Sequence, residues 1–454
     1  MNNVKYRECI TGLEDTLRGV MFCRELEFSA VRLIFIKYVV DNCIGASTRE
    51  EMLLCNRAQM AFSRRDVNNG IDSIISVLNY IDNAYHLEGV LSGQDTINKY
   101  SAELFGKDTS TYKRSSTARN YEAVMEFLSK LDLVEDDVLQ TKGMMWVNAL
   151  VDEILDNSTK YGFLSECTTR QELSKLASGI LNVSADDRYC DFVSGAGLST
   201  LEIVKDKNTT INIADKDQSS VAIAAMLLIM SGYKDINVRC EDTLLKTCEK
   251  LNGNKIFVDA PFGRPFIKGT NNTNRNIEYK YNDYSLDVMD KIINDYLDDS
   301  DDAIAVMTIH PGFLFRSNRQ TAEFKAKLIK QGVIKAVIAL PPLKNKTAVN
   351  VNLIVLTRKY NDKIIFVDAT ECQEKSNNRI EVLPDSSIKK IISVIEESVE
   401  EEGFSKVISL SEIANKEYSL IPTMYIEQRQ IEDNTTLSEV NSQLSDLYKR
   451  LLNM

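Results

Sequence analysis

The sequence predicts an α/β protein with a Rossmann-like sheet, an all-helical N-terminal domain and a helical C-terminal tail. Its 454 residues are too many for one compact core, so two or three domains are expected. Residues 1–165 carry helical patterns throughout. From about residue 168, short β-branched runs alternate with helical stretches, which is typical of a parallel sheet. We therefore expect a helical domain at 1–165, an α/β domain at 166–405 and a C-terminal segment at 406–454.

The N-terminal region has helical periodicity and no strong strand alternation. The segment 25–41 is apolar around nearly its whole circumference, which predicts a helix buried among other helices. Further helices are expected at 70–85, 118–130 and 144–155. At the far end of the chain, coiled-coil spacings of three and four separate Leu437, Val440, Leu444, Leu447 and Leu451. This terminal helix is expected to pack on another helix, either of this chain or of a partner.

The α/β region is expected to contain eight strands. Their ranges are 189–193, 210–214, 236–240, 255–259, 303–309, 334–340, 352–358 and 363–368. The last of them follow one another without room for a helix, which predicts an antiparallel edge. The polar stretch 268–283 is expected to be a loop, and the acidic stretch 396–402 a solvated helix end.

Composition narrows the classes of function. The formal net charge of −12 does not suit an autonomous DNA-binding domain, so any action on DNA should borrow contacts from a partner or gather lysines on one face. The nine cysteines form no C-x-x-C pair and the only histidines are His86 and His310, so no metal centre is expected. The longest apolar run, 221–230, is too short to cross a bilayer, and the N-terminus lacks a signal core. We expect a soluble, cytoplasmic protein with no membrane association.

The first candidate site is the segment 191–197, D-F-V-S-G-A-G, which ends a strand and precedes a helical run. Gly195 and Gly197 lack a Cβ, so they allow a tight turn and a close approach of the backbone to a ligand. The following helix N-terminus would present N–H groups to a carboxylate or a phosphate. A lone G-x-G pair fits a plain strand–helix turn equally well.

Acidic residues end the strands of this region. Asp215 and Asp242 close the two strands that follow Asp191, and a carboxylate there can accept hydrogen bonds from ribose hydroxyls. Each one alone also fits a helix N-cap. Together, their spacing favours a nucleoside ligand. A nicotinamide dehydrogenase is a weaker alternative, because Thr200 stands where the dinucleotide fingerprint needs Gly or Ala.

A further strand ends in the segment 259–263, D-A-P-F-G. Asp259 and the backbone carbonyl of Ala260, held by Pro261, would place two acceptors side by side. Such a pair suits an exocyclic amino group, and Phe262 suits stacking on a base removed from a duplex. A lone D-x-P-F segment also fits a strand that simply ends in a turn.

Taken in order, these segments resemble the modification subunit of type I restriction–modification systems, an N6-adenine DNA methyltransferase family. The resemblance spans nearly the whole chain and is also carried by the segments 13–19, 33–38, 215–226, 242–244, 312–316, 340–342 and 418–426. It implies a Rossmann-like, S-adenosylmethionine-dependent methyltransferase sheet. It also implies S-adenosyl-L-methionine as cofactor, with a binding site formed by Thr169, Asp191, Gly195, Gly197, Asp215 and Asp242.

The resemblance further implies a catalytic motif and partners. A target adenine would be flipped out of DNA and held by Asp259, Ala260, Pro261 and Phe262. Its N6 would take the methyl group without help from a metal. The implied partners are DNA, a specificity subunit that reads the DNA sequence and a restriction subunit, in a hetero-oligomer.

Departures from the family keep a second hypothesis open. Asp259 stands for the family's Asn, Ala260 for its first Pro, and Thr168-Thr169-Arg170 for a Tyr-Thr-Pro segment. Other amino-methyltransferases accept Asp at the first position, and Ala260 keeps the backbone carbonyl. The alternative function is a catalytically degenerate methyltransferase-fold subunit that acts in assembly or DNA binding with an active partner.

Overall fold

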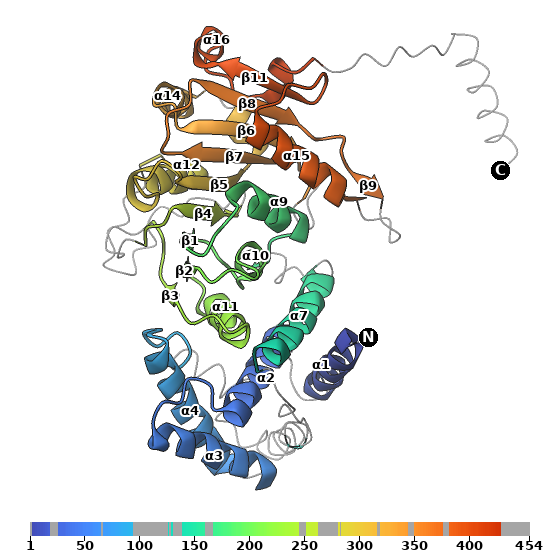
Figure 1. The fold of residues 1–454 in the computed structure, drawn as a ribbon, viewed down its shortest axis with the longest axis vertical. Helices are drawn as coiled ribbons and strands as arrows, with labels where there is room; N and C mark the ends of the chain where they lie inside the picture. The colour runs from blue at the N-terminus through green and yellow to red at the C-terminus, as the bar shows by residue number, and fades with distance from the viewer. Residues whose placement is uncertain are drawn as a thin grey trace, which may run out of the picture.

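The structure is a computed structural model that describes residues 2–18, 26–64, 67–93, 126, 129, 139–158, 167–244, 251–261, 280, 281, 283–315, 318–343, 349–375 and 381–427. Figure 1 shows helices at one end of the long axis and a sheet flanked by helices at the other. Three sequence expectations fall wholly or mostly outside the described residues: the helix at 118–130, the loop at 268–283 and the terminal heptad helix.

The N-terminal part is built from helices, as predicted. Its described helices are α1 (Asn2–Arg18), α2 (Leu26–Asn42), α3 (Arg49–Arg64), α4 (Val67–Ala84) and α7 (Leu139–Ser158). α2 is buried on all sides from residue 27 to residue 40, which confirms the prediction made from its unbroken apolar pattern. The helices expected at 70–85 and 144–155 are confirmed as α4 and α7. None of the helices in the described part of the chain combines the length and apolar character that a bilayer crossing requires.

The second part contains a nine-stranded sheet. Along the sheet, the strands are β11 (Ser405–Ser409), β8 (Lys363–Asp368), β6 (Ile334–Leu340), β7 (Val351–Thr357), β5 (Ile304–Ile309), β4 (Lys255–Val258), β1 (Arg188–Asp191), β2 (Thr210–Asp215) and β3 (Ile236–Cys240). All eight predicted strands are present, with ends shifted by at most two residues. A separate antiparallel pair is formed by β9 (Glu374–Lys375) and β10 (Glu381–Val382).

The expected antiparallel edge is only partly correct. β7 is antiparallel, but it lies between β5 and β6 in the middle of the sheet. All seven of its residues are buried, which suits an interior position better than an edge. The antiparallel edge strand is instead β11, which pairs with β8 and was not predicted from the sequence. Because β11 begins at residue 405, the sheet continues beyond the expected end of the α/β domain.

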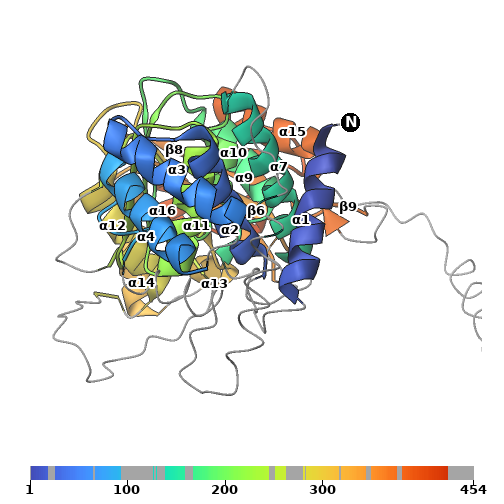
Figure 2. The same cartoon turned by 90° about the horizontal axis from the view of Figure 1, so that it is seen from below.

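Helices cover both faces of the sheet (Figures 1 and 2). One apolar cluster contains α9 (Gln171–Leu181), α10 (Leu198–Ile203), α11 (Gln218–Met230) and α15 (Asp385–Glu397). The other contains α12 (Tyr284–Lys291), the π-helix η1 (Ile292–Tyr296), α13 (Pro311–Phe315) and α14 (Arg319–Lys330). Consecutive residues of β5 alternate between the two clusters, as they must when a strand is covered on both sides. The short elements α16 (Leu410–Asn415) and η2 (Pro422–Met424) follow β11.

Helix α11 joins the two parts of the molecule. Twelve of its 13 residues are buried, because it packs on β2 and β3 on one side and on α2 and α7 on the other. Arg32 of α2 donates to the hydroxyl of Ser219 at 3.1 Å. Gly143 of α7 meets the end of α11 so closely that a Cβ there would lie 2.0 Å from the carbonyl oxygen of Met230. The helical part and the sheet therefore share one core.

Candidate functional site

The candidate residues lie along one edge of the sheet because of its strand order. β4, β1, β2 and β3 are neighbours and run parallel, so their carboxyl ends meet at the same edge. We call Asp191, Asp215, Asp242 and Asp259, which end or follow these strands, the strand-end acids. The carboxyl group of Asp191 lies close enough to Asp215 and Asp259 for both to repel its charged form.

Asp191 is the most buried of the strand-end acids, with 1% of its surface exposed. Its Oδ1 accepts from the backbone N–H of Val193 at 3.1 Å, and its Oδ2 accepts from the hydroxyl of Ser199 at 3.3 Å. Burial raises the pKa of Asp191 to about 8; the bond from Val193 opposes this rise and repulsion from Asp215 adds to it. The hydrogen bonds to the buried carboxyl group of Asp191 therefore stabilise the start of the 191–197 loop.

The two loop glycines are needed for the shape of the protein itself. Gly195 and Gly197 have φ angles of +54° and +77°, in the left-handed region that side chains disfavour. A Cβ at Gly195 would lie 2.4 Å from the carbonyl oxygen of Cys167, and one at Gly197 would lie 2.7 Å from the Cβ of Ala224. From the sequence, these glycines are expected to allow a close approach of a ligand. Among the described residues, the groups that approach them closely are the protein's own.

Asp215 ties the loop to the next strand. Its Oδ2 accepts from the N–H of Gly195 at 2.9 Å, and its Oδ1 accepts from the N–H of Asp217 at 2.8 Å. Burial raises the pKa of Asp215, and the two backbone N–H groups oppose that rise. Asp242 lies beyond β3, where its Oδ1 accepts from the N–H of Leu244 at 3.1 Å. Both residues are partly exposed at the carboxyl edge.

Asp259 is held between two threonine hydroxyls. Thr169, two residues before α9, donates to its Oδ2 at 2.9 Å. Thr308, near the end of β5, donates to its Oδ1 at 2.6 Å. The family resemblance implies a place for Thr169 in the cofactor site, and the structure brings its side chain onto the first residue of the D-A-P-F motif. Ala260 is buried and Pro261 is partly exposed, whereas Phe262 lies outside the described residues.

Sequence reasoning did not single out Thr308. The signal that was available is its position as the one polar residue in the run A-I-A-V-M-T-I at 303–309. A buried polar group in an apolar strand usually has a hydrogen-bond partner. Thr308 therefore indicates a partner elsewhere in the chain, although the local sequence does not say which residue it is. The partner, Asp259, comes from the neighbouring strand β4.

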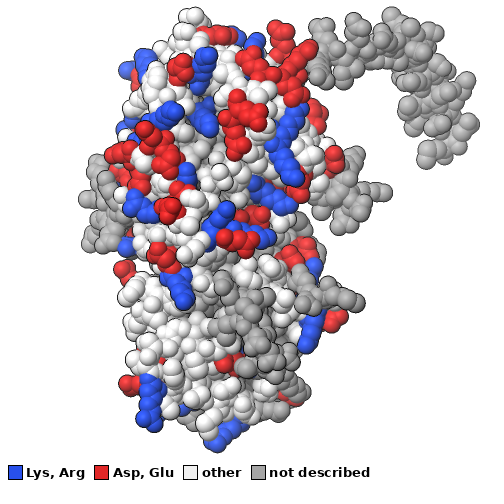
Figure 3. All heavy atoms as spheres, viewed as in Figure 1, with Lys and Arg blue, Asp and Glu red and all other residues white. Residues whose placement is uncertain are grey.

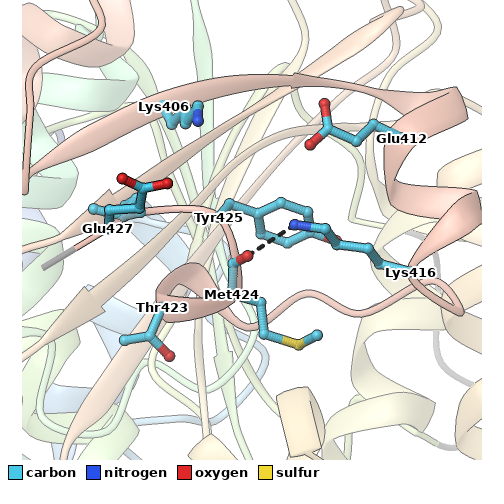
Figure 4. A pocket seen from close by; sticks show the side chains of 8 residues that line it. Lys406, Glu412, Lys416, Thr423, Met424, Tyr425 and Glu427 are labelled. Carbon is cyan, nitrogen blue, oxygen red and sulfur yellow. Dashed lines mark hydrogen bonds between the residues drawn. The ribbon is translucent and has the colours of Figure 1, made fainter.

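A pocket lies beside β11, the strand that forms one lateral edge of the sheet (Figure 4). It has a volume of about 500 Å³ and is lined by residues of β11, α16 and the segment 423–427. Lys416 donates to the carbonyl oxygen of Met424 at 2.9 Å and lies 4.4 Å from the ring centre of Tyr425. Four strands separate β11 from β4, and no strand-end acid lines the pocket. It does not belong to the candidate site.

Comparison with known proteins identifies the family of this chain. The N-6 DNA methylase family matches residues 159–434. The chain is 24% identical over 319 residues to the type I restriction enzyme MjaVIII methylase subunit of Methanocaldococcus jannaschii, covering 63% of this chain and 54% of that protein. It is 26% identical over 151 residues to the MjaVII methylase subunit of the same organism, covering 32% of this chain and 26% of that protein. The chain thus spans about half the length of the first relative.

Solved structures share the fold. The methyltransferase subunit of a type I restriction–modification system from Streptococcus thermophilus has a TM-score of 0.66 at 19% identity, covering 94% of this chain and 100% of that one. A chain from a study of assembly and conformational transition in the type I R-M system has a TM-score of 0.63 at 14% identity, covering 98% and 95%. The predicted fold class, a methyltransferase sheet behind a helical N-terminal region, is confirmed. Since the family match covers more than half of its length, the chain belongs to the N-6 DNA methylase family.

Proposed function

We propose that this chain transfers a methyl group from S-adenosyl-L-methionine to N6 of adenine in DNA, as the methylation subunit of a type I-like restriction–modification system. Family membership supports the reaction class. The observation that carries the proposal is geometric: four neighbouring parallel strands bring the 191–197 loop, Asp215, Asp242 and Asp259 to one edge. Ligands of open α/β sheets bind at such carboxyl edges.

The residues at this edge fit S-adenosylmethionine. An ionised carboxylate offers about four acceptor positions. Backbone N–H groups occupy two positions on Asp215, so acceptor capacity remains for ribose hydroxyls. Asp242 would accept from the adenine amino group of the cofactor, and the 191–197 loop would hold the methionine part. A cofactor with sulfonium and ammonium charges also suits an edge rich in carboxyl groups.

The D-A-P-F motif would hold the target base. When bound, S-adenosylmethionine supplies an electrophilic methyl group. Asp259 and the carbonyl of Ala260 would accept hydrogen bonds from the N6 amino group of a flipped adenine, which turns its lone pair out of the ring π-system. An oxygen of Asp259 would then accept the proton that the amino group gives up. Positioning by these acceptors supplies most of the expected rate, and Phe262 would stack on the base.

The departures from the family motif are compatible with catalysis. Asp259 retains acceptor oxygens where the family has Asn, and hydroxyls from two different elements hold its carboxyl group. Ala260 keeps its backbone carbonyl directly after β4. We therefore favour the active enzyme over a degenerate subunit that serves only in assembly or DNA binding.

The proposed partners are DNA, a specificity subunit and a restriction subunit in a hetero-oligomer. The relatives in Methanocaldococcus jannaschii are named methylase subunits of type I restriction enzymes. On the face in Figure 3, basic and acidic side chains are interspersed over the sheet part, and the helical part shows few of either. With a net charge of −12, the chain is poorly suited to hold DNA by phosphate contacts of its own.

Calorimetric titration tests the cofactor part of the proposal. We expect the full chain to bind S-adenosylmethionine, and Asp215→Ala to weaken binding by roughly 10- to 100-fold, the worth of a hydrogen bond to a charged group. Asp186→Ala is the matched control. Asp186 is exposed, and because it precedes β1 it lies at the amino ends of the parallel strands, away from the candidate site. Failure of the unaltered chain to bind, alone and with a specificity partner, would contradict the proposal.

A methylation assay tests the catalytic motif. The substrate is genomic DNA without adenine methylation, the methyl donor is tritiated, and a specificity subunit that assembles with this chain is present. We expect Asp259→Ala to lower the single-turnover rate by about 10²- to 10³-fold, as is typical when one acceptor or donor of a transition-state site is removed. S-adenosylmethionine affinity should stay near that of the unaltered chain. Methylation that survives this substitution would refute the role given to Asp259.

A further inference from the structure

Thr308 is a polar residue in an otherwise apolar strand. It is 0% exposed and, by strand alternation, shares a face of β5 with Ile304 and Val306, which belong to the apolar cluster that includes α9. A valine would suit this position equally well in shape, and it would carry no hydroxyl that needs a partner. The hydroxyl of Thr308 donates to Oδ1 of Asp259 at 2.6 Å. Packing alone does not explain a threonine here, whereas this bond does.

The two threonine hydroxyls fix the orientation of the Asp259 carboxylate plane, which an aspartate side chain does not fix by itself. The last torsion of Asp is broad and roughly two-fold, so packing around Cβ does not set the plane of the carboxylate. Thr169 donates to Oδ2 from the turn before α9, and Thr308 donates to Oδ1 from β5. Two donors on different oxygens, supplied by different elements, hold this plane in one orientation.

We propose that Thr308 is a positioning residue for methyl transfer, whose hydroxyl aims the carboxylate of Asp259 at the target amino group. The inference deepens the proposed function and rests on it. A carboxylate oxygen accepts along its lone-pair directions, so the held plane decides where these directions point. Orientation matters at this level, because a misplacement of about 1 Å can lower a rate by about 10²-fold.

The same bond makes Asp259 and Thr308 a matched pair. An ionised carboxylate only accepts hydrogen bonds, so both threonine hydroxyls can donate to it. An amide at position 259 would turn an N–H group toward one of these hydroxyls, which would then have to accept. A pair of donating hydroxyls thus suits the Asp of this chain better than the Asn of its family. Because Thr308 is proposed to act through this carboxylate, it should lose most of its effect on the rate once Asp259 is replaced by Ala.

Three variants test the proposal in the methylation assay described above. Thr308→Val removes the hydroxyl at nearly constant shape, and we expect a fall of roughly 10- to 100-fold in the single-turnover rate. S-adenosylmethionine affinity should stay within about twofold, since Thr308 bonds to Asp259 and not to Asp215. Thr308→Ser restores the hydroxyl and should return the rate to within about threefold. On an Asp259→Ala background, Thr308→Val should cost much less than on the unaltered chain.

The matched control is Thr357→Val. Thr357 is also a mostly buried threonine, it lies in the neighbouring strand β7, and its hydroxyl donates to the carbonyl oxygen of Lys359 at 2.9 Å. It pairs with Ile304 at the opposite end of β5, away from Asp259. A general loss of stability on removing a strand hydroxyl would appear in both variants. A loss of rate with unchanged cofactor affinity should appear only in Thr308→Val.

The outcomes separate this inference from the proposed function. Full activity of Thr308→Val, no rescue by Thr308→Ser, or an undiminished effect on the Asp259→Ala background would each overturn the role of Thr308 and leave the proposed function standing. Absence of methyl transfer by the unaltered complex would overturn the proposed function, and the role of Thr308 with it.

Discussion

Asp191 is a carboxylic acid in a place that disfavours its charge. It is 1% exposed, and the carboxyl groups of Asp215 and Asp259 lie near it. Burial is the main cause of its raised pKa of about 8, so the neutral form dominates at neutral pH. A neutral carboxyl can donate one hydrogen bond as well as accept, which a buried charged group could not do at comparable cost. The loop that precedes α10 is thus built around an uncharged acid.

The free energy of unfolding should depend on pH through this residue. The folded pKa of about 8 lies above the ordinary value of 3.8, so between about pH 4 and pH 8 the folded state keeps a proton that the unfolded state has released. Stability from this group is present below about pH 4 and is lost as the pH rises through about 8, by at most about 1.4 kcal/mol per pH unit.

Asp191→Asn should flatten that dependence. Urea unfolding at several values between about pH 5 and pH 8 would measure the slope for the unaltered chain and for the variant. Asp186→Asn serves as the control, because Asp186 is exposed. Equal slopes for all three proteins would show that Asp191 does not carry a shifted pKa.

The strand-end acids could be found from the sequence because each one lies within two residues of the end of a predicted strand. Asp191, Asp215, Asp242 and Asp259 therefore reached the same edge once the strands were parallel. Their hydrogen-bond partners could not be found this way. Thr169 and Thr308 lie 90 and 49 residues from Asp259, and only the packing of α9 and β5 beside β4 brings them to it.

At the scale of elements, periodicity predicted which segments form strands better than where they lie. β7 and β8 were predicted within one residue, because their apolar runs are continuous. The position of β7 between β5 and β6 depends on pairing across distant segments, which a local pattern does not encode. β11 was not predicted, although it is as long as β3, which was.

The contact between α7 and α11 allows a prediction at this scale. Gly→Ala in an ordinary helix is stabilising by roughly 0.5–1 kcal/mol. At Gly143 the added methyl group would meet the carbonyl oxygen of Met230 at 2.0 Å, so the backbones must separate. We expect Gly143→Ala to lower stability by roughly 1–3 kcal/mol, as overpacking does.

Thermal unfolding would measure the effect of Gly143→Ala. Asn148→Ala is the control on the same helix, since Asn148 is exposed and its replacement should change stability by less than about 0.5 kcal/mol. A rise in stability for Gly143→Ala would mean that α7 and α11 do not meet as closely as the structure has them.

At the scale of the whole molecule, the net charge limits the affinity for DNA that we expect of the chain alone. With a net charge of −12, the chain alone should bind a DNA duplex weakly at about 0.15 M salt, and a specificity partner should strengthen binding by more than about 10-fold. Fluorescence anisotropy with a labelled duplex would measure both affinities over a salt series. Equally tight binding by the chain alone would show that it gathers enough basic side chains on one face to dispense with a partner.

The place of β7 has a consequence for how the chain acquires its structure during synthesis. β7 lies between β5 and β6, and both of these precede it in the chain. Until residue 357 has left the ribosome, β5 and β6 each present an unpaired, apolar edge. The nascent sheet is then open to wrong pairing for as long as translation of this stretch lasts, a few seconds at about 5–20 residues per second. The central part of the sheet can therefore close only after β7, the last of these three strands to be synthesised, has left the ribosome.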